Sequence, residues 1–443
     1  MSGAETAPLA FNLNMAAAGA VLVVTYAFIF AETLHRTSAA VIGAVVMIGI
    51  GSWLGFYSEA QALRAVDGNT MLLLTGMMML VAMLRPTGGL EYLAVRIAKL
   101  TAHSPSLLFV YLSAVVSIVS MFLDNVTTVV IFAPLTVLIM RLLNLNPLPY
   151  LMAEAMLSNI GGIATLVGDP PNIMIGSAAG ISFNQFLIHM GPPVLVVWAV
   201  SVTMLLFLFR RELSPPPGYT GEVDMDEHKA ITDPDTLRRV LIALGVVIVL
   251  FFLHHHLDIA PAYVSFIGVA LALALLRLNP EPVLQQVEWT VLLFFGALFA
   301  IVGGVDASGL LALIGGKVAA YARQPDMLLW TCLALLWVAA LLSAFLDNIP
   351  FTVTMIPIVA SLEQEGINTM ALWWALALGV GLGGNGTHIG ATANVICVAQ
   401  SERCGIPEAR ITPQIWLRKG LPTMLLSLAV VTAIFSLAFS YFQ

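Results

Sequence analysis

Apolar stretches long enough to cross a lipid bilayer recur along this chain from one end to the other. A transmembrane helix needs about 20 consecutive, mainly apolar residues. Charged residues are scarce, since Asp, Glu, Lys and Arg make up 10% of the 443 residues, against about 25% in an ordinary soluble domain. So few charges could not cover the surface of a water-soluble fold. We therefore expect an all-α membrane protein that crosses the bilayer many times.

One polar segment near the middle divides the apolar stretches into two sets. We predict a first membrane repeat over residues 1–211, a cytoplasmic linker over residues 212–237 and a second membrane repeat over residues 238–443. The first apolar stretch has no basic segment before it and is followed by many similar ones. It is therefore interpreted as a membrane span and not as a cleaved signal peptide.

The second half of the sequence repeats motifs of the first with an offset of about 220 residues, which indicates an internal duplication. The block Phe-Leu-Asp-Asn at residues 122–125 returns at residues 345–348, and the glycine-rich block 161–172 returns at 383–394. A weaker third match pairs Gly76 and Gly89 with Gly296 and Gly309. Three blocks in the same order make coincidence an inadequate explanation.

The Asp-Asn block interrupts one apolar segment in each half, at residues 105–141 and 326–360. Each piece is then only about 15 residues long, too short to cross the membrane. We therefore predict two re-entrant helical hairpins, 105–141 and 326–360. Backbone that turns inside a membrane is tolerated only where it is buried in protein or lines a wet cavity. Each half thus contains five spans and one hairpin.

The positions of the basic residues predict how the two halves are oriented, because short cytoplasmic loops carry an excess of Lys and Arg. With five spans per half and an external N-terminus, the 18 Lys and Arg face the cytoplasm except Arg64, Lys317 and Arg323. Because five is odd, the halves insert in opposite orientations. We therefore predict an inverted repeat in the inner membrane, an architecture common among secondary transporters.

Asp124 and Asp347 are predicted at the hairpin tips, beside Asn125 and Asn348. A carboxylate at the centre of a membrane helix costs about 2.5–3.5 kcal/mol, so it persists mainly where it faces a cavity, a proton or a cation. The alternative is helix N-capping, which does not require membrane depth. We expect both roles, with three hydroxyls nearby as further candidate ligands: Thr127, Thr128 and Thr352.

The glycine-rich blocks are predicted to unwind inside the membrane. Glycine permits unusual backbone angles, and Pro170 and Pro171 remove hydrogen-bond donors. The oxygen-rich clusters that result suit hard cations or hydroxylated solutes. Close helix packing is the alternative, but it does not account for Asp169 or the prolines. The candidate binding residues are Asn159, Gly161, Gly162, Thr165, Asp169 and Asn172 in the first half, and Gly383, Gly384, Asn385, Thr387 and Asn394 in the second.

Protonatable residues in these blocks are candidates for proton coupling: Asp124, Asp347, Asp169 and His388. A lone histidine such as His388 can titrate near neutral pH but is more often structural. The histidine run 254–256 is interpreted as a solvated span end. Arg36 closes the first span, where anchoring at the interface and a functional role stay open.

No Lys or Arg lies in either tip or either glycine-rich block. This argues against a divalent organic anion held by salt bridges, which would have to rely on helix N-termini alone. The three cysteines have neither disulfide-framework nor metal-ligand spacing. We therefore expect no metal site and no cofactor, and without a basic face we expect no nucleic-acid partner.

At these motifs the chain resembles the ion transporter superfamily and, within it, the group formed by the arsenite/antimonite pump ArsB, the NhaD sodium/proton antiporters and the melanosomal P protein. The resemblance lies in both LDN blocks, in GGIATLVGDPPNI and GGNGTHIGATANV, and in ETLHRT, TGMMMLVAML and EWTVLLFFGALF. It implies an elevator-type fold with a transport domain made of the hairpins and broken spans. It also implies a scaffold domain that holds oligomer contacts, with a homodimer and a soluble ATPase, as in arsenite pumps, as expected partners.

The function expected from these features is proton-coupled efflux of a small inorganic solute, arsenite or antimonite by resemblance. Sodium/proton antiport is the first alternative, and an anion or carboxylate carrier of the same superfamily is the second. Related sodium-coupled dicarboxylate carriers are similar at the tips but have Ser-Asn-Thr where this chain has Asp-Asn followed by Val126 or Ile349. An intramembrane enzyme with an aspartate dyad is disfavoured, because each aspartate lies in its own hairpin. A passive channel is the remaining alternative.

Overall fold

The computed structural model describes residues 10–31, 33–217, 219–221, 226–277, 279–324, 327–345 and 347–443. Within these ranges the regular structure is entirely helical. Eight of the described helices are long and apolar enough to cross a membrane. The prediction of an all-α membrane protein is therefore confirmed.

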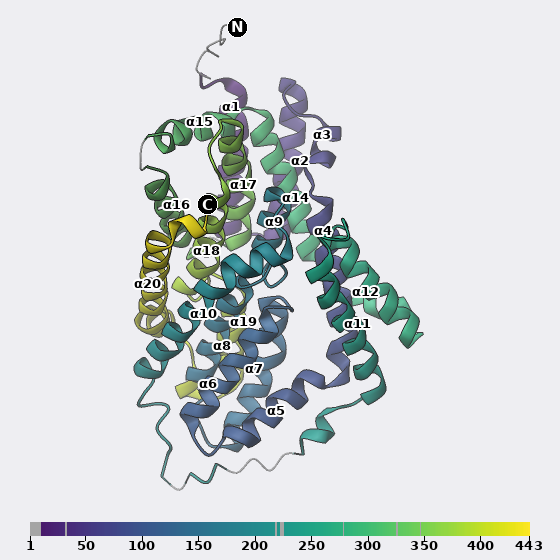
Figure 1. The fold of residues 1–443 in the computed structure, drawn as a ribbon, viewed down its shortest axis with the longest axis vertical. Coiled ribbons are helices and arrows are strands. Elements are labelled where there is room, and N and C mark those ends of the chain that lie inside the picture. Colours follow the sequence, from purple (N-terminus) through teal and green to yellow (C-terminus); the bar gives the residue numbers. More distant parts are fainter. Residues whose placement is uncertain are drawn as a thin grey trace.

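The described helices follow the same order in the two halves of the chain (Figure 1). The first half contains α1 (Leu13–Phe30), α2 (Arg36–Leu54), α3 (Glu59–Ala65), α4 (Gly68–Leu84), α5 (Gly89–Thr101), α6 (Pro105–Ser120), α7 (Asn125–Leu142), α8 (Leu148–Ile163), α9 (Pro170–Ala179) and α10 (Phe183–Leu208). The second contains α11 (Pro234–Leu253), α12 (Pro261–Leu276), α13 (Pro280–Gln285), α14 (Trp289–Ala307), α15 (Leu310–Ala322), α16 (Met327–Ser343), α17 (Asn348–Gln364), α18 (Met370–Gly383), α19 (Thr392–Arg403) and α20 (Pro413–Leu437). Short 3₁₀ turns join some of them, among them η1 (Arg85–Thr87), η2 (Glu227–Ala230) and η3 (Gly384–Gly386).

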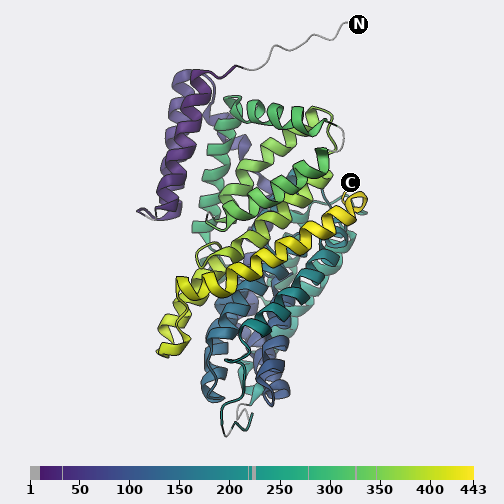
Figure 2. The ribbon, with the colours of Figure 1, turned by 90° about the vertical axis from the view of Figure 1, so that its left-hand side faces the viewer.

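These helices pack in three groups. Helix α2 packs between α1 and α14, and α12 packs between α4 and α11. In Figure 1 the first group lies at the top of the view, and the second lies below it on the right. The third group contains α6 to α9 and α16 to α19, with the long helices α10 and α20 running side by side across it (Figure 2). The three groups meet at the turns where α7, α9, α17 and α19 begin.

Helices α8 and α18 form the centre of the third group. Every residue of α8 is buried, as is nearly all of α18. A helix that is apolar on all its faces is normally surrounded by other elements. Helix α8 contacts five helices: α6, α7, α10, α18 and α19. Polar side chains on α8 are therefore surrounded by protein.

Each Asp-Asn block separates two helices, as the sequence predicts. Asp124 caps α7 by accepting the Thr127 N–H at 2.9 Å, and Asp347 caps α17 in the same way through the Ile349 N–H at 3.5 Å. The second arm of the first hairpin is longer than the predicted 15 residues: α7 has 18 residues and qualifies as a membrane span by length and composition. Leu142 ends α7 one residue past the predicted limit.

The third sequence match was wrong by one residue. Gly88, with φ of +76°, precedes α5, and Gly309, with φ of +84°, precedes α15. The glycine equivalent to Gly309 is therefore Gly88 and not Gly89. Only the left-handed backbone angle distinguishes the two adjacent glycines, because that conformation is open to glycine at little cost.

The segment between the two halves is attached to α5. Glu227 in η2 accepts hydrogen bonds from Lys99 at 2.5 Å and Arg96 at 2.9 Å, and the Thr232 N–H donates to the Thr87 carbonyl at 3.0 Å. The hydrogen bond from Lys99, then a backbone hydrogen bond and the bond from Arg96, lower the pKa of Glu227 to about 2.

We expect the Glu227→Gln variant to have a lower apparent Tm than the wild type at pH 7, by a few degrees. A carboxyl whose pKa is lowered on folding stabilises the fold above its ordinary pKa of 4.5, and this contribution disappears as the pH falls towards about 2. The difference in Tm should therefore shrink below pH 4.5 in detergent melting curves. Glu281→Gln, on the exposed start of α13, is the control. A difference that is the same at pH 7 and pH 3 would contradict the ion-pair account.

Candidate functional site

An enclosed cavity of about 50 Å³ lies where the three helix groups meet. Its walls come from the α7 tip, the start of α9, α4 and α14. Most of the lining is apolar, and its polar side chains are Arg36, Asp124, Glu288 and Thr392. A space of this size holds a few water molecules or one small ion.

Three aspartates converge beside this cavity. Asp169 is 2% exposed and directly precedes Pro170 of the cavity wall. Asp124 lines the cavity itself, and Asp347 accepts a hydrogen bond from Arg36, another lining residue. The hydrogen-bond donor to Asp169 is Asn348, whose Nδ2 lies 3.2 Å from Oδ2 of Asp169. The structure thus brings the second hairpin tip into contact with the break in the first half.

Buried asparagines connect the first tip to the breaks in both halves. Asn159 of α8 accepts a hydrogen bond from Asn125 at 2.9 Å. Its own Nδ2 donates to Oδ1 of Asn385 at 2.9 Å and of Asn394 at 3.1 Å. The Oδ1 atom of Asn125 has no hydrogen-bond partner among the described residues. It is therefore a buried acceptor available to a bound species.

The break between α8 and α9 is closed by one asparagine side chain. Asn172 donates to the carbonyls of Gly162 at 3.0 Å and Thr165 at 2.9 Å. These bonds satisfy carbonyls that lost their helical partners, which an apolar environment requires. The Thr165 hydroxyl donates to the Met121 carbonyl and so attaches the break to the hairpin turn.

The break between α18 and α19 is closed in the same way. Asn394 donates to the carbonyls of Gly384 at 2.7 Å and Thr387 at 2.9 Å. The Thr387 hydroxyl donates to the carbonyl of Ala344, which occupies the position of Met121 in the second hairpin. The duplicated sequence blocks are therefore duplicated turns with the same hydrogen bonds.

The candidate glycines have a packing role. A Cβ on Gly161 would lie 2.3 Å from the Ser117 carbonyl oxygen, and one on Gly383 would lie 2.3 Å from that of Ala340. Gly162 lies similarly close to the Gly168 carbonyl, at 2.7 Å, and Gly384 has backbone and side-chain neighbours beyond 3 Å. Close approach of helices accounts for these glycines without a ligand.

The remaining candidates differ in their surroundings. The Thr127 hydroxyl donates to Asp124 at 2.6 Å, so it supports the cap. Thr128 and Thr352 are fully buried and donate to backbone carbonyls. His388 is partly exposed in the second break and has no side-chain hydrogen bond to any described residue. The structure does not join it to the three aspartates.

Arg36 is a residue whose role the sequence left open. Its Nη1 lies 2.9 Å from Oδ2 of Asp347 and 3.2 Å from Oγ1 of Thr392, and the guanidinium lies 5.6 Å from the Phe294 ring centroid. The sequence blocks lack basic residues, but the space around the tip does not. The contact joins residues 311 positions apart, so motif spacing could not reveal it.

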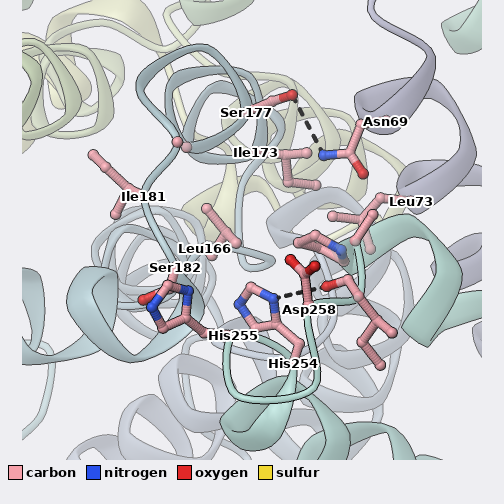
Figure 3. Close-up of a pocket in the computed structure, with 15 residues that line it drawn as sticks. Asn69, Leu73, Leu166, Ile173, Ser177, Ile181, Ser182, His254, His255 and Asp258 are labelled. Atoms are coloured by element: carbon pink, nitrogen blue, oxygen red, sulfur yellow. Dashed lines mark hydrogen bonds between the residues drawn. The ribbon is translucent and has the colours of Figure 1, made fainter.

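His254 corrects a second expectation, that the histidine run is a solvated span end. It lines another cavity, of about 420 Å³, together with Asn69, Ser177 and Asp258 (Figure 3). Nδ1 of His254 donates to the Ile259 carbonyl at 3.1 Å, and Nε2 accepts the Phe183 N–H at 3.1 Å. Burial lowers its pKa, which keeps this tautomer neutral. His255 and His256 are exposed, as expected.

An apolar bundle in which broken helices and hairpin tips enclose polar side chains defines a secondary transporter. The family model described as "Citrate transporter" (CitMHS) matches residues 26–379. The chain belongs to this family, which is part of the ion transporter superfamily.

Curated relatives agree with this assignment. The chain is 38% identical over 417 residues to the 46 kDa membrane protein of Mycobacterium leprae, covering 93% of this chain and 95% of that protein. It is 31% identical to the P protein of Mus musculus, covering 94% of this chain and 59% of that protein. The predicted resemblance to the P-protein group is therefore confirmed.

A solved structure supports the fold. The YdaH transporter of Alcanivorax borkumensis, described as having an unusual topology, matches with a TM-score of 0.60 and 15% sequence identity. The match covers 92% of this chain and 99% of that one. At this identity the likeness concerns the fold alone.

We expect Gly161→Ala to destabilise the protein, because the added Cβ would collide with the backbone of Ser117. Overpacking of this kind costs about 1–3 kcal/mol, measured here as a lower apparent Tm in detergent. The matched control is Gly49→Ala on α2, where the added Cβ meets nothing within 4 Å. Equal Tm values for the two variants would show that the contact between α6 and α8 is not tight.

Proposed function

We propose that this protein is a proton-coupled secondary transporter that exports a small inorganic solute, arsenite or antimonite, across the inner membrane. The observation that carries the proposal is that Asp124 lines one small cavity, while Asp169 and Asp347 lie beside it through Pro170 and Arg36 in its wall. Carboxyl groups at such depth persist mainly where they exchange protons or bind cations. The family assignment supports transport, and the choice of arsenite or antimonite rests on the resemblance to arsenite pumps.

The charge around the cavity favours a neutral or cationic solute. Arg36 is paired with Asp347, so its charge is already compensated. Asp124, Asp169 and Glu288 make no ion pair with a described Lys or Arg. A free organic dianion would therefore meet net negative charge, whereas arsenous acid offers neutral hydroxyls to the amides and carbonyls of the breaks.

For the transport cycle we propose an elevator mechanism built on an inverted repeat. The repeated order of helices and the repeated hydrogen bonds at the breaks support two equivalent halves. The moving unit comprises α6 to α9 and α16 to α19, and the static unit comprises α1, α2, α4, α11, α12 and α14, which would hold a homodimer contact. As part of the arsenite proposal, we also propose that a soluble ATPase binds this protein.

In this mechanism the aspartates release protons when the solute binds and regain them when it leaves. Asp169 is the most enclosed of the three and has a neutral amide as its donor. Arg36 belongs to α2. When the moving unit departs from α2, Asp347 loses its ion pair with Arg36 and binds a proton instead. His388 is partly exposed, so in this proposal it can accept a proton from the solvent.

Carboxylate transport is the second candidate, because the family is described by citrate and because Arg36 lies at a tip. A neighbouring cavity of about 480 Å³ is lined by Tyr26, His35, Arg36, Asp347 and Thr392. It has room for a carboxylate of citrate size. Arg36 would have to release Asp347 to bind such a ligand.

Reconstituted vesicles distinguish these functions. We expect wild-type protein to drive arsenite flux with a pH gradient and without sodium. Asp124→Asn and Asp347→Asn should reduce that flux below about a tenth, as expected for loss of a carboxyl group that the proposed cycle requires. Asp235→Asn, exposed at the start of α11, is the control. Wild-type flux in both tip variants would refute the mechanism. Sodium-driven proton movement without arsenite flux would establish the antiporter instead.

Arg36→Gln separates the two roles of the arginine. Without its cation, Asp347 loses the ion pair that the proposed cycle breaks and remakes, so the rate of arsenite flux should fall severalfold. Arg36→Lys keeps the charge and should lower it less. An unchanged arsenite flux together with a raised KM for citrate would favour the carboxylate carrier.

A further inference from the structure

A further carboxylic acid lies inside the third helix group, away from the cavity. Glu154 of α8 is 1% exposed. It precedes Asn159 by five residues, about 7.5 Å along the helix at 1.5 Å per residue. Glu154 therefore lies between one and two helical turns from the asparagine cluster.

The carboxyl of Glu154 is only half satisfied. The Thr136 hydroxyl of α7 donates to its Oε1 atom, while Oε2 has no hydrogen-bond partner among the described residues. An ionised carboxylate in such surroundings would carry a large desolvation penalty without a cation to offset it. A buried acid with one unused oxygen can instead hold and release a proton.

The second half of the chain shows that packing does not require this polar pair. The repeat places Leu376 of α18 where Glu154 lies in α8, and Val359 of α17 where Thr136 lies in α7. Leu376 and Val359 are 0% and 1% exposed. The equivalent positions are therefore occupied by two buried apolar residues in one half and by a hydroxyl and an acid in the other.

No described cation faces Glu154 from the surrounding helices. Helix α19, which packs on α8, carries the fully buried and uncharged Cys397 thiol, and α18 contributes no titratable group. The other ionisable residues on α6, α7, α10 and α19 lie elsewhere, on exposed faces or at helix ends: Tyr111, Arg141, His189, Glu402 and Arg403. The Arg141 guanidinium, for example, donates to the Cys404 carbonyl.

The position of Glu154 relates it to one end of the molecule. Helices α7, α8 and α19 extend from the breaks towards the end where the linker lies (Figure 1). Glu154 and Thr136 therefore form a hydrogen-bonded polar pair between the breaks and that end. The second half has no such pair at the equivalent positions, Leu376 and Val359.

We propose that Glu154 is a proton-binding site, distinct from the three aspartates, which takes up one proton from the linker side and carries it with the moving unit. The proton is the only species transferred: it binds to Oε2 when water reaches this pair and leaves by the same route. This inference rests on the proposed proton coupling, and it adds a carboxyl group outside the cavity to the aspartates beside it.

Infrared difference spectroscopy on the purified protein tests the proton site directly, without a solute. A pH change should produce a carbonyl band of a protonated carboxylic acid that is lost in Glu154→Gln and retained in Glu363→Gln, an exposed control on α17. The double variant Thr136→Val/Glu154→Leu copies the second half and provides a folded alternative. A band that is absent from the wild type, that persists in both Glu154 variants, or that does not change between pH 5 and 9 would overturn the proposal.

Transport separates this inference from the proposed function. In vesicles, Glu154→Gln should reduce the number of protons moved per arsenite, measured with a pH dye and labelled arsenite. An unchanged ratio would overturn the role of Glu154. Failure of the wild type to move arsenite would instead remove the proposed solute, while the infrared result would still decide whether Glu154 titrates.

Discussion

Backbone groups freed by a helix break inside an apolar bundle must find hydrogen-bond partners within the protein, and the rest of this structure depends on how two asparagines meet that need. Asn172 and Asn394 each bind two carbonyls of their own turn. The closed turns can then lie against the hairpin tips. Without them, Asp169 could not be held at 2% exposure between Asp124 and Asp347, and no polar cavity would form at that depth.

Local signals explain what could be predicted from the sequence. The apolar lengths indicated a helical membrane protein, and the Asp-Asn blocks indicated helix starts at Asn125 and Asn348, because capping depends on residues a few positions apart. The duplicated blocks also indicated that both breaks have the same form. The family resemblance rested on the same residues, which explains why it agrees with the matched family model.

Contacts that depend on how the helices pack against one another explain which parts of the structure could not be predicted from the sequence. Arg36 reaches Asp347 across 311 positions, and Thr136 meets Glu154 only because α7 and α8 pack in one register. Neither pair belongs to a motif. His254 was misjudged for a related reason: a run of three histidines has the polarity of a solvated end, but the turn that follows, with Asp258 at φ of +52°, directs one ring inward.

The arginine at the second tip has no equivalent at the first. The turn before α12, residues 254–260, contains neither Lys nor Arg, so a state in which the two halves exchanged conformations would offer Asp124 no matching cation. The two end states of the proposed cycle would then be unequal in free energy. The resting protein would populate one orientation in excess, and distances between spin labels on α2 and α17 would report that excess. An internal duplication that has diverged at one residue can in this way set the default direction in which an empty carrier faces.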